Sequence, residues 1–248
     1  MSTNLKFLVI GNGFIFPKHE EAIKKIKGNI VDIVNGEQWW GNKIAETEAD
    51  WVVILTPNFT HQQIIDVALS NGKKVICEKP LVLSSEEARK YIGKPVYTIH
   101  QLRYLPLGPF EHSENIDLNI SVHRSADYFN SWKGNLKLSG GLLLNVGIHY
   151  FDLILHYFGE PISVKLDKFA EERAEGTLTG KDYHCHFLID LLAPENKQER
   201  VLTVGGIRYE LNSKENLHIK AYQDIINGRG LDAREAIKSI GLIEKLRQ

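Results

Sequence analysis

The chain has 248 residues, enough for two domains of ordinary size. Its 30 Lys and Arg residues nearly balance 31 Asp and Glu residues, so no overall field attracts nucleic acid or an anionic membrane. Two cysteines, Cys77 and Cys185, are too few for a disulfide framework and are typical of a reducing compartment. We see no signal-peptide pattern and no apolar run near the ~20 residues of a membrane span. We therefore expect a cytoplasmic protein, with neither nucleic acid nor a membrane as partner.

Strand and helix patterns alternate over the first hundred residues. Short apolar runs predict buried parallel strands at 7–10, 30–34, 51–55, 74–77 and 96–99. One helical pattern begins at Pro17 and a second covers 64–69. A third helix begins at Ser84 and Glu87, which form a capping-box pattern. This alternation predicts a Rossmann-like α/β domain with a doubly wound parallel sheet.

The second half of the chain has a different pattern. A long apolar helix is predicted at 141–158, and two closing helices are predicted at 217–226 and 233–246. Strands separated by turns are predicted at 116–124, 163–169, 183–192, 200–204 and 208–211. The fold class is therefore α/β followed by α+β, the second part having an open, mostly antiparallel sheet. We place a shortened dinucleotide-binding domain at 1–104 and a substrate and oligomerisation domain at 105–248.

A glycine turn follows the first predicted strand. Gly11 and Gly13 stand where a dinucleotide fingerprint begins, between a strand and a helix. The first glycine would allow a tight turn, and the second would let a pyrophosphate approach the helix N-terminus. Phe16 replaces the third glycine, which changes how helix and strand pack. The pattern predicts a dinucleotide site, with a strand–turn–helix that holds no ligand as the alternative.

The second predicted strand ends without a carboxylate at the usual place. An acidic residue that binds the adenosine ribose is expected about 20 residues after the glycine turn. Asn35 and Gly36 stand there instead, with Asp32 inside the strand and Glu37 just beyond. Asparagine can bond a ribose hydroxyl but brings no charge, so the sequence leaves NAD versus NADP open. The stretch 35–50 is also short for the usual helix, strand and helix, so it is open whether this side still binds adenosine.

Glu78, Lys79 and Pro80 follow a predicted strand of the parallel sheet. Ligands of open α/β sheets lie beyond the carboxyl ends of the strands. A lysine beside a carboxylate in such a crevice can hold a substrate hydroxyl and tune its proton. The motif therefore predicts chemistry, whereas a proline that only ends the strand is the plainer alternative.

Four polar residues interrupt the long apolar helix. They are Asn145, His149, Asp152 and His156. Their spacing predicts that all four lie on one face of an α-helix, where buried polar groups need partners. Three interpretations compete. The four groups could be hydrogen-bonded to one another and to partners at an interface with the first domain, or His149, Asp152 and His156 could form a metal site. In the third, His149 is a catalytic acid and base.

His184 and His186 flank Cys185 in a predicted strand. In a strand the two histidines share one face while the cysteine points to the other, so the three do not converge on a metal. We treat this triplet as strand composition and expect no metal site in the chain.

Four motifs occur in a fixed order: Gly11-Asn12-Gly13, Thr56-Pro57-Asn58 with His61, Glu78-Lys79-Pro80, and Gly147-x-His149-x-x-Asp152. This ordered set resembles the glucose–fructose oxidoreductase and inositol dehydrogenase (Gfo/Idh/MocA) family. The resemblance implies a Rossmann domain followed by an α/β domain with an open antiparallel sheet. Segments 13–19, 101–103, 131–134 and 139–141 resemble the UDP-N-acetylglucosaminuronate 3-dehydrogenase branch, whose members act in bacterial lipopolysaccharide biosynthesis.

By this resemblance the chain is an NAD-dependent oxidoreductase that oxidises the 3-hydroxyl of a UDP-linked N-acetyl-hexosaminuronate. Lys79 would bond the reacting hydroxyl, His149 would take its proton, and Asn145 would orient the substrate. Cofactor-binding positions implied by the resemblance are Gly11, Gly13, Phe14, Ile15, Asn35, Thr56, Pro57, Asn58, His61, Glu78, Lys79 and Gln101, with Glu78 under the nicotinamide side. Substrate-binding candidates are Arg103, Arg124, Lys133, Asn145 and Asp152, with Lys137 as a further cation, because a UDP-uronate carries phosphates and a carboxylate.

Two alternatives stay open at this point. One keeps the chemistry but changes the substrate to a free sugar or a cyclic polyol. The other is a relative that binds a sugar nucleotide without turning it over, because the cofactor side is shortened and Phe16 departs from the fingerprint. We expect a homodimer or homotetramer through the second-domain sheet, since a broad open sheet often needs a partner to cover it.

Overall fold

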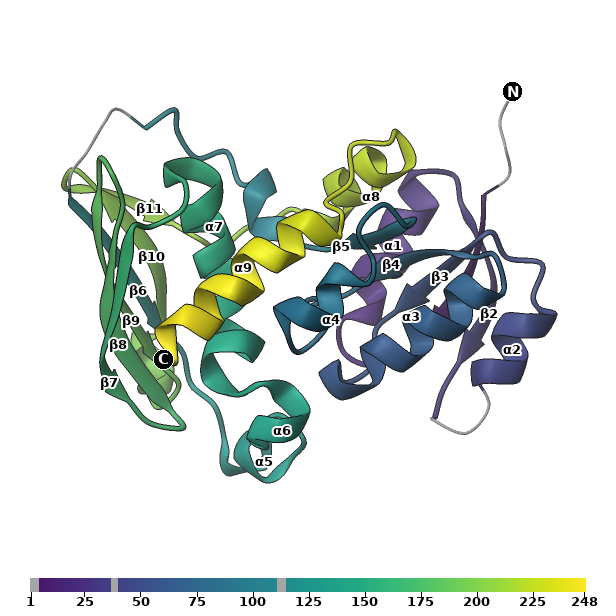
Figure 1. Cartoon of the computed structure of the whole chain (residues 1–248), viewed down its shortest axis with the longest axis horizontal. Coiled ribbons are helices and arrows are strands. Elements are labelled where there is room, and N and C mark those ends of the chain that lie inside the picture. The colour runs from purple at the N-terminus through teal and green to yellow at the C-terminus, as the bar shows by residue number, and fades with distance from the viewer. Residues whose placement is uncertain (1–4, 37–39, 111–114) are drawn as a thin grey trace. The chain divides into compact units, whose positions relative to one another are not determined.

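The computed structural model describes residues 5–36, 40–110 and 115–248 (Figure 1). It divides into two compact units. The first consists of Met1–Gln101 and Glu215–Ile237, and the second of Leu102–Lys214 and Lys238–Gln248.

The first unit is built on a five-stranded, wholly parallel sheet in the order β2-β1-β3-β4-β5. Its strands are β1 (Lys6–Ile10), β2 (Asn29–Val34), β3 (Trp51–Ile54), β4 (Lys74–Cys77) and β5 (Val96–Thr98). Its helices are α1 (Phe16–Lys25), α2 (Trp40–Glu46), η1 (Asn58–Thr60), α3 (His61–Ser70), α4 (Ser85–Arg89) and α8 (His218–Ile226). The predicted Rossmann-like sheet is confirmed. Because the chain passes from β1 to β2 on one side and then to β3 on the other, β1 lies at the topological switch point.

Local chemistry explains where two of these helices begin. Pro17 lies in the first turn of α1, where its missing N–H costs no hydrogen bond. Ser84 caps α4 and accepts from the Glu87 backbone N–H, while the Glu87 carboxylate accepts from the Ser84 N–H. The predicted capping box is therefore present. Between β2 and β3 the described chain forms only the short helix α2, so the region after Asn35 is indeed abbreviated.

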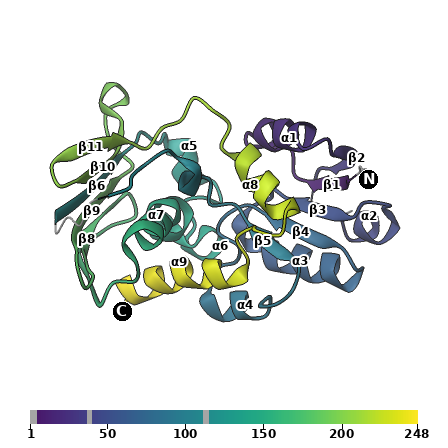
Figure 2. The same ribbon diagram turned by 90° about the horizontal axis from the view of Figure 1, so that it is seen from above.

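The structure corrects the predicted division of the chain in one respect. Residues 215–237 belong to the first unit rather than to the second domain. Helix α8 packs against α1 although the two are far apart in sequence (Figure 2). Its Tyr222 is fully buried and contacts the rings of Phe7 and His19. The first unit therefore needs this late segment to complete its core.

The second unit contains a six-stranded sheet in the order β11-β10-β6-β9-β8-β7. Its strands are β6 (Asn115–Ser121), β7 (Ser163–Phe169), β8 (Arg173–Thr179), β9 (His184–Asp190), β10 (Glu199–Val204) and β11 (Ile207–Glu210). Its helices are, in chain order, η2 (Gln101–Tyr104), α5 (Ala126–Asn130), α6 (Leu136–Ser139), η3 (Leu143–Gly147), α7 (Ile148–Phe158) and η4 (Glu195–Lys197). The first residue of η2 belongs to the first unit. Helix α9 (Ala233–Leu246) begins in the first unit and ends in the second. The sheet is antiparallel except between β6 and β9, so the prediction of a mostly antiparallel sheet is confirmed.

Strand β8 was missed by sequence reasoning, and its glycine explains why. Gly176 interrupts the strand with a residue that weakens strand propensity. A Cβ at this position would lie 2.2 Å from the Lys165 carbonyl oxygen and 2.8 Å from the Phe187 ring. The glycine is therefore required by close packing between neighbouring strands. That requirement cannot be predicted from the sequence without knowing which strands are neighbours.

The long apolar helix packs on the inner face of this sheet. Phe151 of α7 meets Phe187 of β9 with ring centroids 5.1 Å apart, and a Cβ at Gly147 would press on Phe151 and Ile189. The helical stretch Leu136–Phe158 is long and apolar enough to cross a membrane, which corrects the expectation that no run approaches that length. Because 72% of its most apolar window is buried within the protein, the stretch has the character of a core helix.

Candidate active site

The carboxyl ends of the parallel strands bring the predicted cofactor residues to one edge of the first sheet. Gly11 follows β1, Asn35 follows β2, Thr56 follows β3, Glu78 follows β4 and Gln101 follows β5. Neighbouring parallel strands end at the same edge, which is where ligands of open α/β sheets bind.

The glycine turn has the geometry that its two glycines predict. Gly11 has φ +94°, and a Cβ there would lie 2.9 Å from the Leu55 carbonyl oxygen, so both conformation and space require glycine. Gly13 is exposed, and a Cβ there would meet nothing within 4 Å. Phe14 is 86% exposed beside it, and Ile15 stands at the N-cap of α1, where no side chain of the described residues caps the helix. The turn therefore leaves space at Gly13 for a phosphate to approach the N-terminus of α1.

His61 has a different role from the predicted one. Its side chain is fully buried, so it does not itself line a dinucleotide site. Its Nδ1 lies 2.8 Å from the Pro80 carbonyl oxygen and its Nε2 lies 2.9 Å from the Thr56 carbonyl oxygen. Burial lowers the pKa of His61. His61 therefore joins the loop after β3 to the loop after β4. Thr56 and Pro57 are half-buried, while Asn58 is buried at the start of η1.

Gln101 brings a buried acceptor to this edge. Among the described residues, no donor lies within hydrogen-bonding distance of its side-chain oxygen Oε1, which is shielded from solvent. A buried amide oxygen of this kind costs free energy unless a donor reaches it. Together with the turn at Gly11 and Gly13, it shows that the residues present fit a bound dinucleotide.

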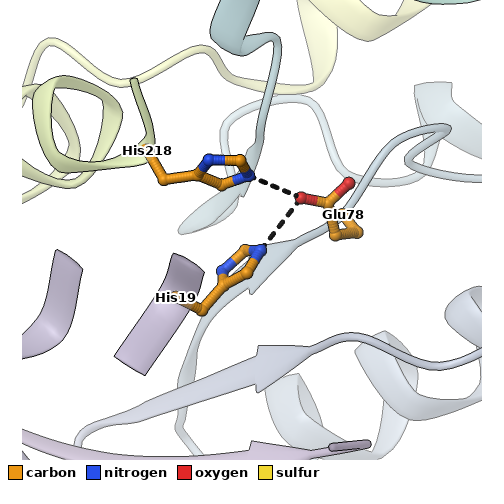
Figure 3. A group of neighbouring side chains, drawn as sticks. All are labelled: His19, Glu78 and His218. Carbon is orange, nitrogen blue, oxygen red and sulfur yellow. Dashed lines mark hydrogen bonds and ion pairs between the residues drawn. The ribbon is translucent and has the colours of Figure 1, made fainter. Parts of the chain in front are cut away.

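The Glu78 carboxylate is held by two histidines (Figure 3). Its Oε1 lies 3.0 Å from His19 Nε2 and 3.3 Å from His218 Nε2, and its Oε2 accepts the backbone N–H of Lys79 at 3.2 Å. Burial alone would raise the pKa of Glu78, but the two imidazole contacts outweigh it and hold that pKa well below its usual range. The Glu78 carboxylate thus lies within a polar cluster of the protein itself, and its place under the nicotinamide stays a prediction. The Lys79–Pro80 peptide bond is cis, and Lys79 is half-buried.

Sequence reasoning missed both histidines of this cluster. His19 lies on α1 and His218 on α8, so no local spacing connects them with Glu78. Their ligand atoms and that of Glu78 lie within 4.8 Å of one another, and this donor set also suits a divalent cation.

The second unit gathers three predicted substrate residues around one tyrosine. Tyr128 of α5 accepts a hydrogen bond from Asn145 Nδ2 at 2.8 Å. The Arg124 guanidinium lies 5.5 Å from the Tyr128 ring centroid, and the Lys133 ammonium lies 5.8 Å from it. Two cations and an amide thus converge on a half-buried ring, although Tyr128 itself was not among the predicted residues. Such a group can bind an anion.

Arg103 and Asp152 bind each other. Arg103 donates from Nε at 2.8 Å and from Nη2 at 2.7 Å to the two carboxylate oxygens of Asp152. The side chains are 9% and 1% exposed, respectively. Both were predicted as separate substrate contacts, and a bidentate pair is the better description. Because both oxygens of Asp152 are engaged by the arginine, the structure also disfavours a metal site made with His149 and His156.

The four polar residues of the long helix do not form one stripe. A π-helical turn at Leu143–Gly147 contains Asn145, so the spacing from Asn145 to His149 is not that of an α-helix. Asn145 and Asp152 are buried, His149 is half-buried and His156 is exposed. His149 therefore stands at the first turn of α7, directly after the π-helical turn. Such turns often occur at functional sites.

His184, Cys185 and His186 lie in strand β9, as predicted. Cys185 is buried, whereas His184 contacts Thr179 and His186 pairs with Asp117 at 3.0 Å on the other face. The prediction that the histidines and the cysteine point to opposite faces is confirmed.

The two units together define the class of the protein: an oxidoreductase with a Rossmann domain and a second domain built on an open sheet. Residues 41–93 match the NAD-binding Rossmann fold of the Gfo/Idh/MocA oxidoreductase family, and residues 114–194 match its C-terminal alpha/beta domain. The two matches cover more than half of the chain. The chain belongs to the Gfo/Idh/MocA family, as its ordered motifs indicated.

Named relatives show what the chain is similar to. It is 25% identical over 219 residues to glucose-6-phosphate 3-dehydrogenase from Bacillus subtilis, covering 72% of this chain and 62% of that enzyme. It is 25% identical over 161 residues to an uncharacterised oxidoreductase from Schizosaccharomyces pombe, covering 56% of this chain and 42% of that protein. The chain thus spans less than two thirds of these curated relatives.

A solved structure matches over almost the whole chain. It is that of the WlbA (WbpB) dehydrogenase from Thermus thermophilus in complex with NAD and UDP-GlcNAcA. The match has a TM-score of 0.88 and 27% identity, and it covers 98% of this chain and 95% of the other.

Proposed function

We propose that this chain is an NAD-dependent dehydrogenase that oxidises the 3-hydroxyl of a UDP-linked N-acetyl-hexosaminuronate. The observation that carries the proposal is the place of Lys79, at the carboxyl end of β4 and at the same sheet edge as the Gly11 turn. The match to a dehydrogenase solved with NAD and UDP-GlcNAcA supports this substrate class. Formation of NADH from the UDP-linked uronate is the experiment that tests it.

In the proposed reaction the C3 carbon loses a hydride and its hydroxyl loses a proton, leaving a ketone. When bound, NAD would supply the acceptor for this hydride and its electron pair. Lys79 donates a hydrogen bond to the hydroxyl oxygen, which lowers the cost of removing its proton. His149 accepts that proton, a task for which imidazole is suited near neutral pH. Asn145 cannot take a proton, and it orients the sugar together with Tyr128.

We propose that Arg124 and Lys133 bind the anionic groups of this substrate. Replacing either residue by methionine is expected to raise KM for the UDP-linked substrate about 10- to 100-fold, because a charge-assisted hydrogen bond contributes about 1.5–3 kcal/mol. Initial rates over a range of substrate concentrations give the measurement. Lys181→Met, at an exposed position before β9, is the matched control and should leave KM unchanged. An equal rise in KM for Lys181→Met would argue against a specific anion site.

A second candidate keeps the same chemistry on a free or phosphorylated sugar. The match to glucose-6-phosphate 3-dehydrogenase over 72% of this chain favours it. Comparing turnover of UDP-linked, phosphorylated and free sugars separates the two candidates. The Arg124 and Lys133 variants should affect turnover of only those substrates that carry an anion.

We further propose a homodimer or homotetramer formed through the outer face of the six-stranded sheet. Polar and charged residues such as His186, Asp117 and Arg173 cover this face, while Phe169 at the end of β7 and Ile207 at the start of β11 are large apolar side chains that stay exposed. Light scattering of the purified chain tests this, since a monomer would contradict it. Cytoplasmic location and a place in lipopolysaccharide synthesis also stay proposals, and they agree with two buried, free cysteines and with the substrate class.

A further inference from the structure

Two buried histidines converge on the Glu78 carboxylate, and the proposed reaction gives this cluster no task (Figure 3). His19 comes from α1 and His218 from α8, while Glu78 follows β4, and all three belong to the first unit. The side chains of His19, His218 and Glu78 are 0%, 6% and 12% exposed, respectively. A buried carboxylate is costly unless its charge is compensated, so such a cluster is a candidate for a bound cation.

The donor set of this cluster is one that zinc prefers. Zinc in proteins is bound by imidazole nitrogens and carboxylate oxygens, and two histidines with one glutamate are a known set in sites where water is the fourth ligand. Magnesium and calcium prefer oxygen ligands, so the two imidazoles disfavour them. Among the described residues the cluster consists of these three ligand groups. Because Glu78 keeps some contact with solvent, a water could complete the coordination.

The ligand atoms already have nearly the spacing of a zinc site. Nε2 of His19 lies 3.0 Å from Oε1 of Glu78, and Nε2 of His218 lies 3.3 Å from the same oxygen. The ligand atoms of the three residues all lie within 4.8 Å of one another. Ligands at about 2.0–2.1 Å from a tetrahedral zinc ion are themselves about 3.3 Å apart. An ion therefore fits among these atoms after side-chain shifts of less than about 1 Å.

A further residue holds the outer nitrogen of each imidazole ring. Nδ1 of His218 lies 3.1 Å from Oδ1 of Asn216, and Nδ1 of His19 lies 2.9 Å from the Tyr222 hydroxyl. The Asn216 amide is itself oriented, because its Nδ2 donates to the Lys18 carbonyl oxygen at 2.7 Å. Histidines that bind metals almost always have such a partner on the second nitrogen, which fixes the ring with its other nitrogen toward the ion. Both Nε2 atoms accordingly point toward one place (Figure 3).

We propose that His19, Glu78 and His218 bind one zinc ion, with water as the fourth ligand. The ion joins α1, the end of β4 and α8, and so fixes the late segment 215–237 in the first unit. Its role is structural. Oε2 of Glu78 accepts the Lys79 N–H at 3.2 Å, so the ion also steadies the backbone of Lys79; the benefit to catalysis rests on the proposed function, whereas zinc binding does not. No metal site was expected from the sequence, since no local spacing joins these three residues.

Zinc titration of the untagged chain tests the proposal. After metal is removed with a chelator, the wild type should bind one zinc ion with a dissociation constant below about 1 µM. Zinc at about 100 times that constant should raise the melting temperature by roughly 5–10 °C, whereas magnesium should not. His19→Gln and His218→Gln each keep a side chain that can bond Glu78 but remove a zinc ligand, so each should weaken zinc binding at least about 100-fold.

Two histidines on the second sheet give the matched control. His184 and His186 lie on one face of β9, where His186 pairs with Asp117. The double variant His184→Ala with His186→Ala removes these imidazoles and should leave the zinc affinity within about twofold of the wild type. Crystals grown with zinc should show an anomalous-scattering peak about 2.0–2.2 Å from Nε2 of both His19 and His218.

The outcomes separate this proposal from the proposed function. No stoichiometric zinc at about tenfold above the expected dissociation constant, an unchanged affinity in both glutamine variants, or an anomalous peak elsewhere would each overturn it. If a glutamine variant does not fold, the wild-type titration and the anomalous peak still decide. A chain that binds zinc at this cluster but forms no NADH would contradict the proposed function alone, and an active dehydrogenase that binds no zinc would contradict the zinc site alone.

Discussion

Lys79→Ala and His149→Ala are each expected to lower kcat by about 10²- to 10⁴-fold, the range for removing a group that transfers or bonds the reacting proton. Lys79 would no longer hold the substrate hydroxyl, and without His149 no positioned base would accept its proton. Initial rates of NADH formation give the measurement. Binding of NAD should persist in both variants, because the Gly11 turn is untouched.

The controls for this experiment are an exposed lysine and an exposed histidine. Lys25→Ala on α1 and His156→Ala on α7 change the same residue types at solvent-facing positions and should leave kcat within about twofold. All four variants should have melting temperatures near that of the wild type. Unchanged rates for both Lys79→Ala and His149→Ala would refute the assigned roles.

Asp152→Ala is expected to lower the free energy of unfolding of the second unit by about 3–5 kcal/mol. The bidentate bond to Arg103 is buried, so removing the carboxylate takes two charge-assisted hydrogen bonds from a buried guanidinium. Replacing both partners, as in Arg103→Met with Asp152→Leu, should recover most of the loss because no charge remains buried. Denaturant titration followed by fluorescence of the four tryptophans is a suitable measurement.

The control for the buried pair is an exposed one. Glu210→Ala removes the contact of Arg208 with Glu210 at 3.0 Å on the surface and should change stability by less than about 1 kcal/mol. A loss below about 1 kcal/mol for Asp152→Ala would contradict this expectation, because it would show that the buried pair contributes little to stability.

Local patterns predicted most of the first unit, because β1, β3 and β4 are almost wholly buried apolar runs and two of its helices begin with recognisable residues. Pro17 and the pair Ser84 and Glu87 mark helix starts through contacts with their own neighbours in sequence. The inclusion of α8 in this unit could not be predicted in the same way, since it depends on Tyr222 packing against Phe7 across more than two hundred residues.

Prediction of the candidate site was limited in the same way, because local patterns do not show which residues distant in sequence come into contact. The order of motifs identified the strand ends and placed Gly11 and Lys79 at one edge of a sheet. The partners of the polar residues depend on tertiary contacts and were not predicted: Arg103 bonds Asp152, and His218 bonds Glu78. A residue type suggests what a side chain can bind, whereas its actual partner is set by the fold.

The most direct test of the central claim is to mix the purified protein, loaded with NAD, with UDP-linked N-acetylglucosaminuronate and to follow NADH absorbance in a single turnover. Acid release beforehand measures how much dinucleotide the protein already holds. We expect NADH to form with the UDP-linked substrate and the product to carry a ketone at C3. If the protein retains no NAD, its melting temperature does not rise with added NAD, and no NADH forms, then it is a binding protein rather than a dehydrogenase.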